Sequence, residues 1–239
     1  MSAVNELTPP LELLEQLVTS AHILAYVGQG DMVWGHVSVR DPLGRGTWLK
    51  GAGHGLEEIT SEDVVLIDRA GEVLAGSARR HKEFPIHTEV MAARPDVNCV
   101  IHTHPVAPVA LAATGEPLRP VSHEACFFVP PELPCYEETT DLIVTSELGE
   151  RVAATLGGSP GMLLLGHGIV ACGSDVEEAT MSAVLLDRAC RAQLEVLQTG
   201  LRYRWTSDEE ALAKRGNCYP RALIEQGYAY LARRVGCPV

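Results

Sequence analysis

The segment from Val100 to Pro105 reads VIHTHP and places two histidines, His102 and His104, two positions apart at the end of an apolar run. In a β-strand, residues i and i+2 project to the same side, so both imidazoles are expected to reach one metal ion. Pro105 ends the strand and puts the pair at the mouth of a sheet. A His-x-His pair also arises by chance, and a lone strand histidine is more often a surface or core residue than a ligand.

A third histidine, His167, lies between Gly166 and Gly168 at a turn that is expected to join two strands. Glycines permit a tight backbone and leave room around the imidazole. Three imidazoles with an open position are typical of a catalytic rather than a structural divalent site. Glu83, just before a predicted helix, strengthens this interpretation because a carboxylate there could be a ligand or a general base. The residues alone indicate a metal enzyme and leave its reaction open.

The elements that must position these side chains follow from apolar periodicity and from the turn residues between segments. Helices are expected over 11–27, 85–93, 105–113, 145–156 and 176–199, with one or two more in 207–236. The helix over 176–199 is expected to begin after a cap at Ser174-Asp175. Strands are expected over 37–40, 48–50, 64–68, 73–75, 97–103, 122–129, 162–165 and 169–172. Because strict β-α-β alternation is missing, we expect a single α/β domain over 1–239. It has a mostly antiparallel sheet flanked by helices and a helical C-terminal tail from about residue 200.

The composition of the chain limits the classes of molecule that it is expected to bind. The chain has 239 residues, 46% of them apolar, and a net charge of −12, which disfavours nucleic acid and anionic membranes as partners. Residues 1–10 lack the pattern of a secretory signal, and no apolar run approaches the ~18 to 20 residues of a membrane span. Seven scattered cysteines without a C-x-x-C pair fit a reducing cytoplasm. A soluble, cytoplasmic enzyme with a small anionic substrate is expected, and a local basic pocket must capture that substrate.

Several segments together resemble the class II aldolase/adducin family. They are 82–87 (KEFPIH), 93–97 (ARPDV), 102–105 (HTHP) and 165–168 (LGHG), preceded by 35–40 (GHVSVR), which resembles that family's G-N-x-S-x-R segment. Residues 49–68 resemble the glycine-containing loop and strand that follow it. The resemblance runs in order from about residue 11 to 200.

The resemblance implies an α/β/α sandwich and a homotetramer with active sites between subunits. It assigns His102, His104 and His167 to one divalent metal ion per subunit, and Glu83 to the acid–base carboxylate. The ligand types suit Mn²⁺ or Zn²⁺, with Fe²⁺ or Co²⁺ also open. Adducin-like members lack the metal histidines, so this chain resembles the enzyme branch.

The chain departs from the family's sugar-phosphate aldolases at their polar phosphate cradle. The asparagine of G-N-x-S is His36, a Thr-Gly pair reads Ala52-Gly53, and a Ser-Ser pair reads His81-Lys82. Larger, cationic or titratable groups favour a carboxylate bound by Lys82 with His36 or His81. The resemblance therefore gives this set of substrate-binding candidates: His36, Ser38, Gly53, His81, Lys82 and Tyr219, the last by analogy with tail tyrosines that reach a neighbouring subunit's site.

Members that resemble this variant decarboxylate hydroxylated aromatic or pyridine dicarboxylates, so decarboxylation of such an acid is the leading hypothesis. The alternative is an aldolase that cleaves a small hydroxy acid, sugar acid or sugar phosphate. A non-enzymatic adducin-like module is disfavoured by the three histidines, and a sugar-phosphate epimerase by the altered cradle.

Overall fold

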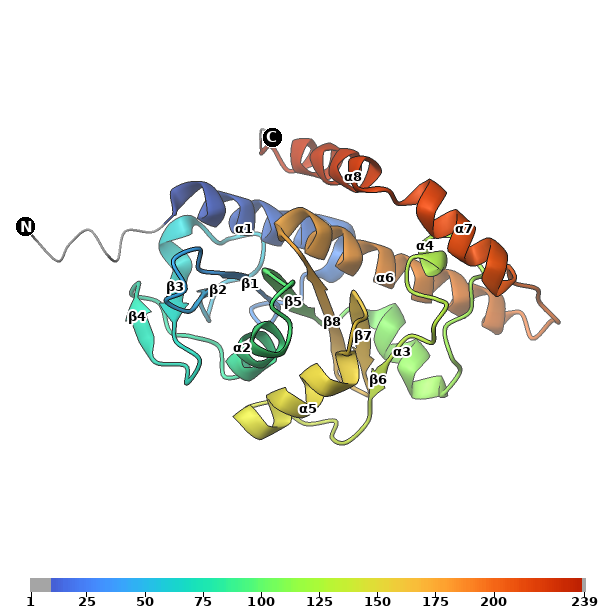
Figure 1. The fold of residues 1–239 in the computed structure, drawn as a ribbon, viewed down its shortest axis with the longest axis horizontal. Helices are drawn as coiled ribbons and strands as arrows, with labels where there is room; N and C mark the ends of the chain where they lie inside the picture. The colour runs from blue at the N-terminus through green and yellow to red at the C-terminus, as the bar shows by residue number, and fades with distance from the viewer. Residues whose placement is uncertain (1–9, 238–239) are drawn as a thin grey trace, which may run out of the picture.

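Strands at the centre of the molecule form one continuous sheet in the computed structural model, which describes residues 10–237 (Figure 1). Residues 1–9, where the absence of a secretory signal was expected, lie outside that range. The strands are β1 His36–Arg40, β2 Thr47–Lys50, β3 Val64–Ile67, β4 Val73–Ala75, β5 Cys99–Thr103, β6 Cys135–Tyr136, β7 Gly161–Leu164 and β8 Gly168–Gly173. Their order is β4-β3-β2-β1-β5-β8-β7-β6. The β6–β7 pair is parallel and the other pairs are antiparallel, which confirms the mostly antiparallel prediction.

Helices cover both faces of this sheet. They are α1 Leu11–Leu24, α2 Phe84–Ala93, α3 Val106–Thr114, α4 His123–Cys126, α5 Ser146–Leu156, α6 Val176–Gln198, α7 Asp208–Cys218 and α8 Arg221–Arg234. Figure 1 shows α2 and α5 side by side on one face and α1 and α6 on the other, with α8 outside them. The layers are those of the expected α/β/α sandwich. No helix in residues 10–237 is long and apolar enough to cross a membrane.

The alternation of β5 decides where its histidines point. Cys99 and Ile101 join the core beneath α1 and α6, whereas Val100 joins the core beneath α2 and α5. Because side chains alternate along a strand, His102 shares the face of Val100 and points toward α2. Residue 102 also pairs across the sheet with His36 of β1, so the register brings a second histidine beside it.

The strand predicted over 122–129 is wrong. Residues 123–126 form α4, whose first turn is capped by the Ser122 hydroxyl accepting a hydrogen bond from the Ala125 N–H. The apolar residues that resemble a strand, including Phe128 and Val129, are buried in the core that α6 shares. Periodicity alone does not separate a short buried strand from a short buried helix. The structure also adds the short strand β6 and extends α1 by a π-helical turn, Ala25–Gln29, in which Gly28 takes φ +87°.

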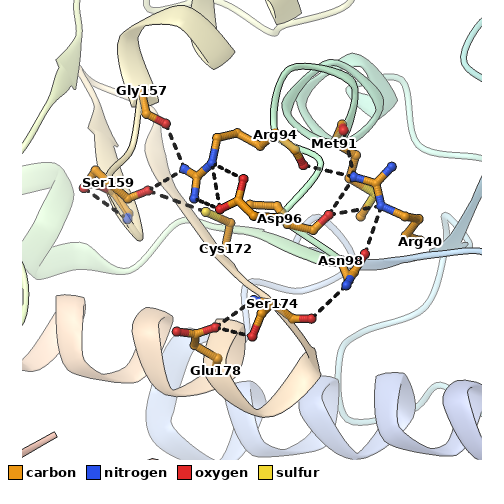
Figure 2. Close-up of polar contacts among 12 residues, drawn as sticks. Arg40, Met91, Arg94, Asp96, Asn98, Gly157, Ser159, Cys172, Ser174 and Glu178 are labelled. Carbon is orange, nitrogen blue, oxygen red and sulfur yellow. Dashed lines mark hydrogen bonds and ion pairs between the residues drawn. The ribbon is translucent and has the colours of Figure 1, made fainter. Parts of the chain in front are cut away.

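Arginine side chains brace the end of the sheet opposite His102. The Arg40 guanidinium donates hydrogen bonds to the carbonyl oxygens of Met91, Arg94 and Val97 and to the Asn98 side chain (Figure 2). It thereby joins the ends of β1 and α2 to the start of β5. The arginine of the GHVSVR segment therefore sets where β5 begins, and with it the register of His102.

A second arginine continues the brace toward α5. Arg94 pairs with Asp96 at 2.6 Å and donates a hydrogen bond to the carbonyl oxygen of Gly157 at 2.8 Å (Figure 2). Arg94 and Asp96 come from the ARPDV segment. Arg40, Arg94 and Asp96 of these two segments thus fix the scaffold, whereas His36 of the first segment pairs with His102 across the sheet.

Replacing Arg40 with methionine is expected to lower the free energy of unfolding by about 2–4 kcal/mol, because carbonyl oxygens that a guanidinium satisfies lose their donor. Urea denaturation followed by circular dichroism measures the change. Arg202→Met is the matched control, because Arg202 is exposed and its side chain makes no hydrogen bond among residues 10–237. Equal stabilities of the two variants would contradict the bracing role.

Candidate metal centre

Three elements bring four potential ligands to one point. His102 is the penultimate residue of β5 and His104 follows the strand, His167 lies in the turn between β7 and β8, and Glu83 is the residue before α2. The turn is tight because Gly166 takes φ +62° and because a Cβ at position 168 would lie 2.4 Å from the Thr103 carbonyl oxygen. Glycine at 168 therefore permits the approach of β8 to β5 that carries His167 to the other histidines.

The ligand atoms of these four side chains all lie within 4.8 Å of one another. The Nε2 atoms of His102 and His104 are 3.0 Å apart. The Glu83 carboxylate lies 3.4 Å from His167 Nε2 and 3.7 Å from His102 Nε2. Ligands of a tetrahedral zinc ion with bonds near 2.1 Å are separated by roughly 3.4 Å. The cluster therefore has the size and the donor types of a divalent metal site.

Hydrogen bonds set the tautomers that a metal requires. His102 Nδ1 donates to the Ile169 carbonyl oxygen at 2.9 Å, and His104 Nδ1 donates to the Asp31 carboxylate at 3.0 Å. Both Nε2 atoms are then unprotonated and face one another, an arrangement that a shared cation would stabilise. Both nitrogens of His167 are buried and lack a hydrogen-bond partner among the described residues. These unsatisfied nitrogens fit a bound metal better than an apolar core.

Burial keeps the imidazoles of His102 and His104 neutral. It lowers the pKa of His102 well below 6.5 and also lowers the pKa of His104, whose pKa is lowered further by His167. Burial alone would raise the pKa of Glu83, but the His167 side chain, the nearby His102 and the Ile143 N–H bring it to about 2. Neutral imidazoles beside a carboxylate anion are the protonation states that bind a divalent cation.

Asp31 holds His104 from outside the cluster. Its carboxylate is the hydrogen-bond acceptor that fixes the His104 tautomer. Asp31→Ala is expected to weaken metal affinity by roughly 10- to 100-fold, and Asp31→Asn by less because an amide oxygen still accepts the hydrogen bond. Competition with a fluorescent chelator measures both. Glu116→Ala removes an exposed carboxylate that makes no contact with the histidines among residues 10–237 and serves as the control. Unchanged affinity in Asp31→Ala would contradict this role.

A second group of histidines adjoins the cluster. The His36 ring centroid lies 5.0 Å from that of His102 and 4.4 Å from that of His81. His36 Nδ1 lies 2.5 Å from His87 Nε2, and His87 Nδ1 lies 2.6 Å from the Ser38 hydroxyl. Burial lowers the pKa of His36 well below 6.5 and that of His87 to about 3. His36 and His81 therefore border the cluster, and Ser38 lies one histidine further away and is fully buried.

The remaining substrate-binding candidates lie at different depths. Gly53 is exposed and takes φ +102° in the loop after β2. Lys82 is exposed at the edge of a hollow that is also lined by Arg80, Phe84, Asp141, Leu142 and Val144. Tyr219 packs edge-on against Phe127, with ring centroids 5.5 Å apart, between α7 and α8. None of these three has a hydrogen bond to the histidine cluster among the described residues.

Sequence reasoning missed two polar residues at this site. Asp31 reaches His104 across 73 positions, and Lys50 reaches His81 across 31. Nothing local marks Asp31. Lys50 could have been noticed because it ends the apolar strand β2, and lysine is rarely fully buried unless it has a partner.

Comparisons with known proteins identify the family of this chain. Residues 15–194 match the family model described as the Class II Aldolase and Adducin N-terminal domain. The chain is 31% identical over 199 residues to a 3,4-dihydroxyphthalate decarboxylase of Terrabacter sp., covering 77% of this chain and 82% of that protein. It is 34% identical over 168 residues to the decarboxylase NovR of Streptomyces niveus, covering 69% of this chain and 62% of that protein.

A solved structure matches the fold. L-fuculose 1-phosphate aldolase of Glaciozyma antarctica superposes with a TM-score of 0.82 at 22% identity, covering 95% of this chain and 93% of that one. The family model spans most of this chain, and two relatives in that family are decarboxylases. The chain belongs to the class II aldolase and adducin family, and its relatives include the decarboxylase branch of that family.

Proposed function

We propose that this protein is a metal-dependent carbon–carbon lyase that decarboxylates a hydroxylated aromatic or pyridine (di)carboxylate. The observation that carries the proposal is the four-residue cluster with His36 and His81 beside it, where a phosphate cradle would require small hydroxyl donors. The similarity to a 3,4-dihydroxyphthalate decarboxylase supports the class of substrate.

His102, His104 and His167 would hold the ion, with Glu83 beside it. When bound, a divalent ion here supplies a Lewis acid that accepts electron density from a substrate hydroxyl and its neighbouring carboxylate. Mn²⁺ or Zn²⁺ suits these ligands, and Fe²⁺ or Co²⁺ remains open. The buried His102 and the partly buried His104 and His167 would limit water on one side of the site, which strengthens electrostatic interactions within it.

Glu83 would move the proton that decarboxylation requires. Loss of carbon dioxide leaves an electron pair on the ring carbon, and a proton must replace the carboxylate there. The ionised Glu83 carboxylate, whose Oε1 accepts a hydrogen bond from the Ile143 N–H, would take the proton of the substrate hydroxyl and return it to carbon. The product then regains its hydroxyl proton from water, which balances the reaction.

The test is a carbon dioxide release assay. Purified protein is stripped with a chelator, reloaded separately with manganese, zinc or cobalt, and supplied with ortho-hydroxylated benzene and pyridine dicarboxylates. Metal-dependent release that His102→Ala abolishes would support the decarboxylase. Aldehyde formed from a hydroxy acid or sugar acid, without carbon dioxide, would move the assignment to an aldolase. Silence in both assays would overturn the proposed reaction.

We also propose that the active unit is a cytoplasmic homotetramer with active sites between subunits. Met32 and Trp34 are 65% and 52% exposed, and they follow Asp31, the acceptor of His104. Large exposed apolar side chains beside a site are typical of an interface. All seven cysteines are free, which is typical of proteins in a reducing compartment and supports the cytoplasmic part of the proposal. Light scattering of the purified protein tests the oligomer, and a monomer with full activity would contradict it.

A further inference from the structure

Lys50 is a fully buried cation at the end of β2. Its side chain is among the largest of the fully buried ones, with 0% exposure. The ammonium donates a hydrogen bond to the Gly51 carbonyl oxygen at 3.1 Å and lies 3.4 Å from His81 Nε2. No carboxylate among residues 10–237 lies within ion-pair distance of it.

A charge buried in this way lowers stability unless an anion accompanies it. Burial lowers the pKa of Lys50 to about 8, and the more distant charges of Asp63, Glu57 and Glu58 offset only part of that effect. The side chain therefore remains largely protonated at neutral pH. An ammonium with one carbonyl acceptor and one imidazole neighbour retains capacity for an anionic acceptor.

The position of Lys50 points to the candidate site. Its neighbour His81 is 8% exposed and packs its ring against His36, which packs against the ligand His102. Lys50 thus lies behind the histidines that border the metal cluster. Lys82, which the sequence pattern favours as the basic group, is exposed outside that row.

We propose that Lys50 and His81 form an anion subsite for the substrate carboxylate that does not chelate the metal. This inference rests on the proposed function, since it assumes an aromatic dicarboxylate. The 3.4 Å separation of the two side chains must widen to admit a carboxylate. Each side offers the freedom to do so: His81 lies in a segment, residues 76–83, that forms neither helix nor strand, and lysine has a flexible four-carbon stem.

The experiment compares Lys50→Met with Lys82→Met in the manganese-loaded full chain. Calorimetry measures binding of two unreactive probes, phthalate with two carboxylates and benzoate with one. Lys50→Met is expected to weaken phthalate binding by ~30-fold or more, because it removes a buried charge partner, and to leave benzoate nearly unchanged. Lys82→Met is expected to change neither. Equal phthalate binding by Lys50→Met and the wild type, or a larger loss in Lys82→Met, would overturn the inference.

Separate control measurements distinguish an effect of Lys50→Met on folding from an effect on binding. Lys50→Met is expected to unfold at the same temperature as the wild type or higher, because methionine replaces a buried charge without a counter-ion. Lys50→Gln gives a polar second variant, for which the same loss of phthalate binding is expected. Probe binding does not require turnover. A wild type that releases no carbon dioxide but distinguishes phthalate from benzoate through Lys50 would sink the proposed reaction and leave this subsite standing.

Discussion

His167→Ala is expected to abolish metal binding and turnover while leaving the fold intact. The His167 ring makes no hydrogen bond among the described residues, so its removal costs the fold less than removal of His102, which is bonded to the Ile169 carbonyl oxygen. Removing a hydrogen-bond partner of a metal ligand typically lowers metal affinity by about 10- to 100-fold. Removing a ligand itself is therefore expected to lower metal affinity by more than about 100-fold. Metal content after dialysis and the rate of carbon dioxide release both measure the effect.

The control for this variant is His54→Ala. His54 is an exposed histidine whose Nδ1 lies 3.3 Å from Asp63, and it is expected to keep wild-type metal content and turnover. Unfolding in urea checks that His167→Ala remains folded. A folded His167→Ala protein with full metal content and full activity would refute the assignment of His167 as a ligand.

Glu83→Gln is expected to lower the turnover number by about 10²- to 10⁴-fold, the range of general acid–base catalysis. Glutamine keeps the shape of the side chain and an oxygen that accepts the Ile143 N–H, so the start of α2 is preserved. What is lost is the carboxylate that is proposed to take and return a proton. Steady-state kinetics on the manganese-loaded protein measures the change.

Metal affinity of the same variant separates the two roles open to Glu83. A carboxylate that only moves a proton leaves affinity within a few fold of the wild type, whereas a fourth ligand lowers it toward the value of His167→Ala. Glu72→Gln, an exposed substitution beside β4, controls for the change in charge. Wild-type turnover in Glu83→Gln would eliminate the acid–base role.

The His102–His104 pair was predictable because its geometry is local, whereas His167 and Glu83 lie far from it in sequence and their assignment relied mainly on the family resemblance. Two residues at i and i+2 of a strand share a face whatever the rest of the fold does, and Gly-His-Gly marks a turn from its own composition. The structure brings His102, His104, His167 and Glu83 together as the sequence predicts. The strands of the antiparallel sheet were predictable for the same reason, since each strand is recognised from the pattern of a few consecutive residues.

Contacts that depend on pairing across the sheet were not predictable in this way. Lys50 adjoins His81 only because β2 lies between β1 and β3, and the pattern instead favoured Lys82, which is next to Glu83 in sequence but exposed. Likewise, the apolar run that ends at Val129 indicates burial without indicating whether a strand or a helix is buried. Sequence therefore located the four candidate ligands, and which basic groups bind the substrate stays a prediction.

Diffraction from crystals grown with Mn²⁺ or Zn²⁺, measured at the absorption edge of the metal, tests most directly whether one divalent ion lies among His102, His104, His167 and Glu83. The result expected here is one anomalous peak per chain among the three histidine Nε2 atoms, adjacent to the Glu83 carboxylate, and no such peak in His167→Ala. A metal-replete, active crystal whose anomalous peak lies away from these four side chains would contradict the assignment of the metal site.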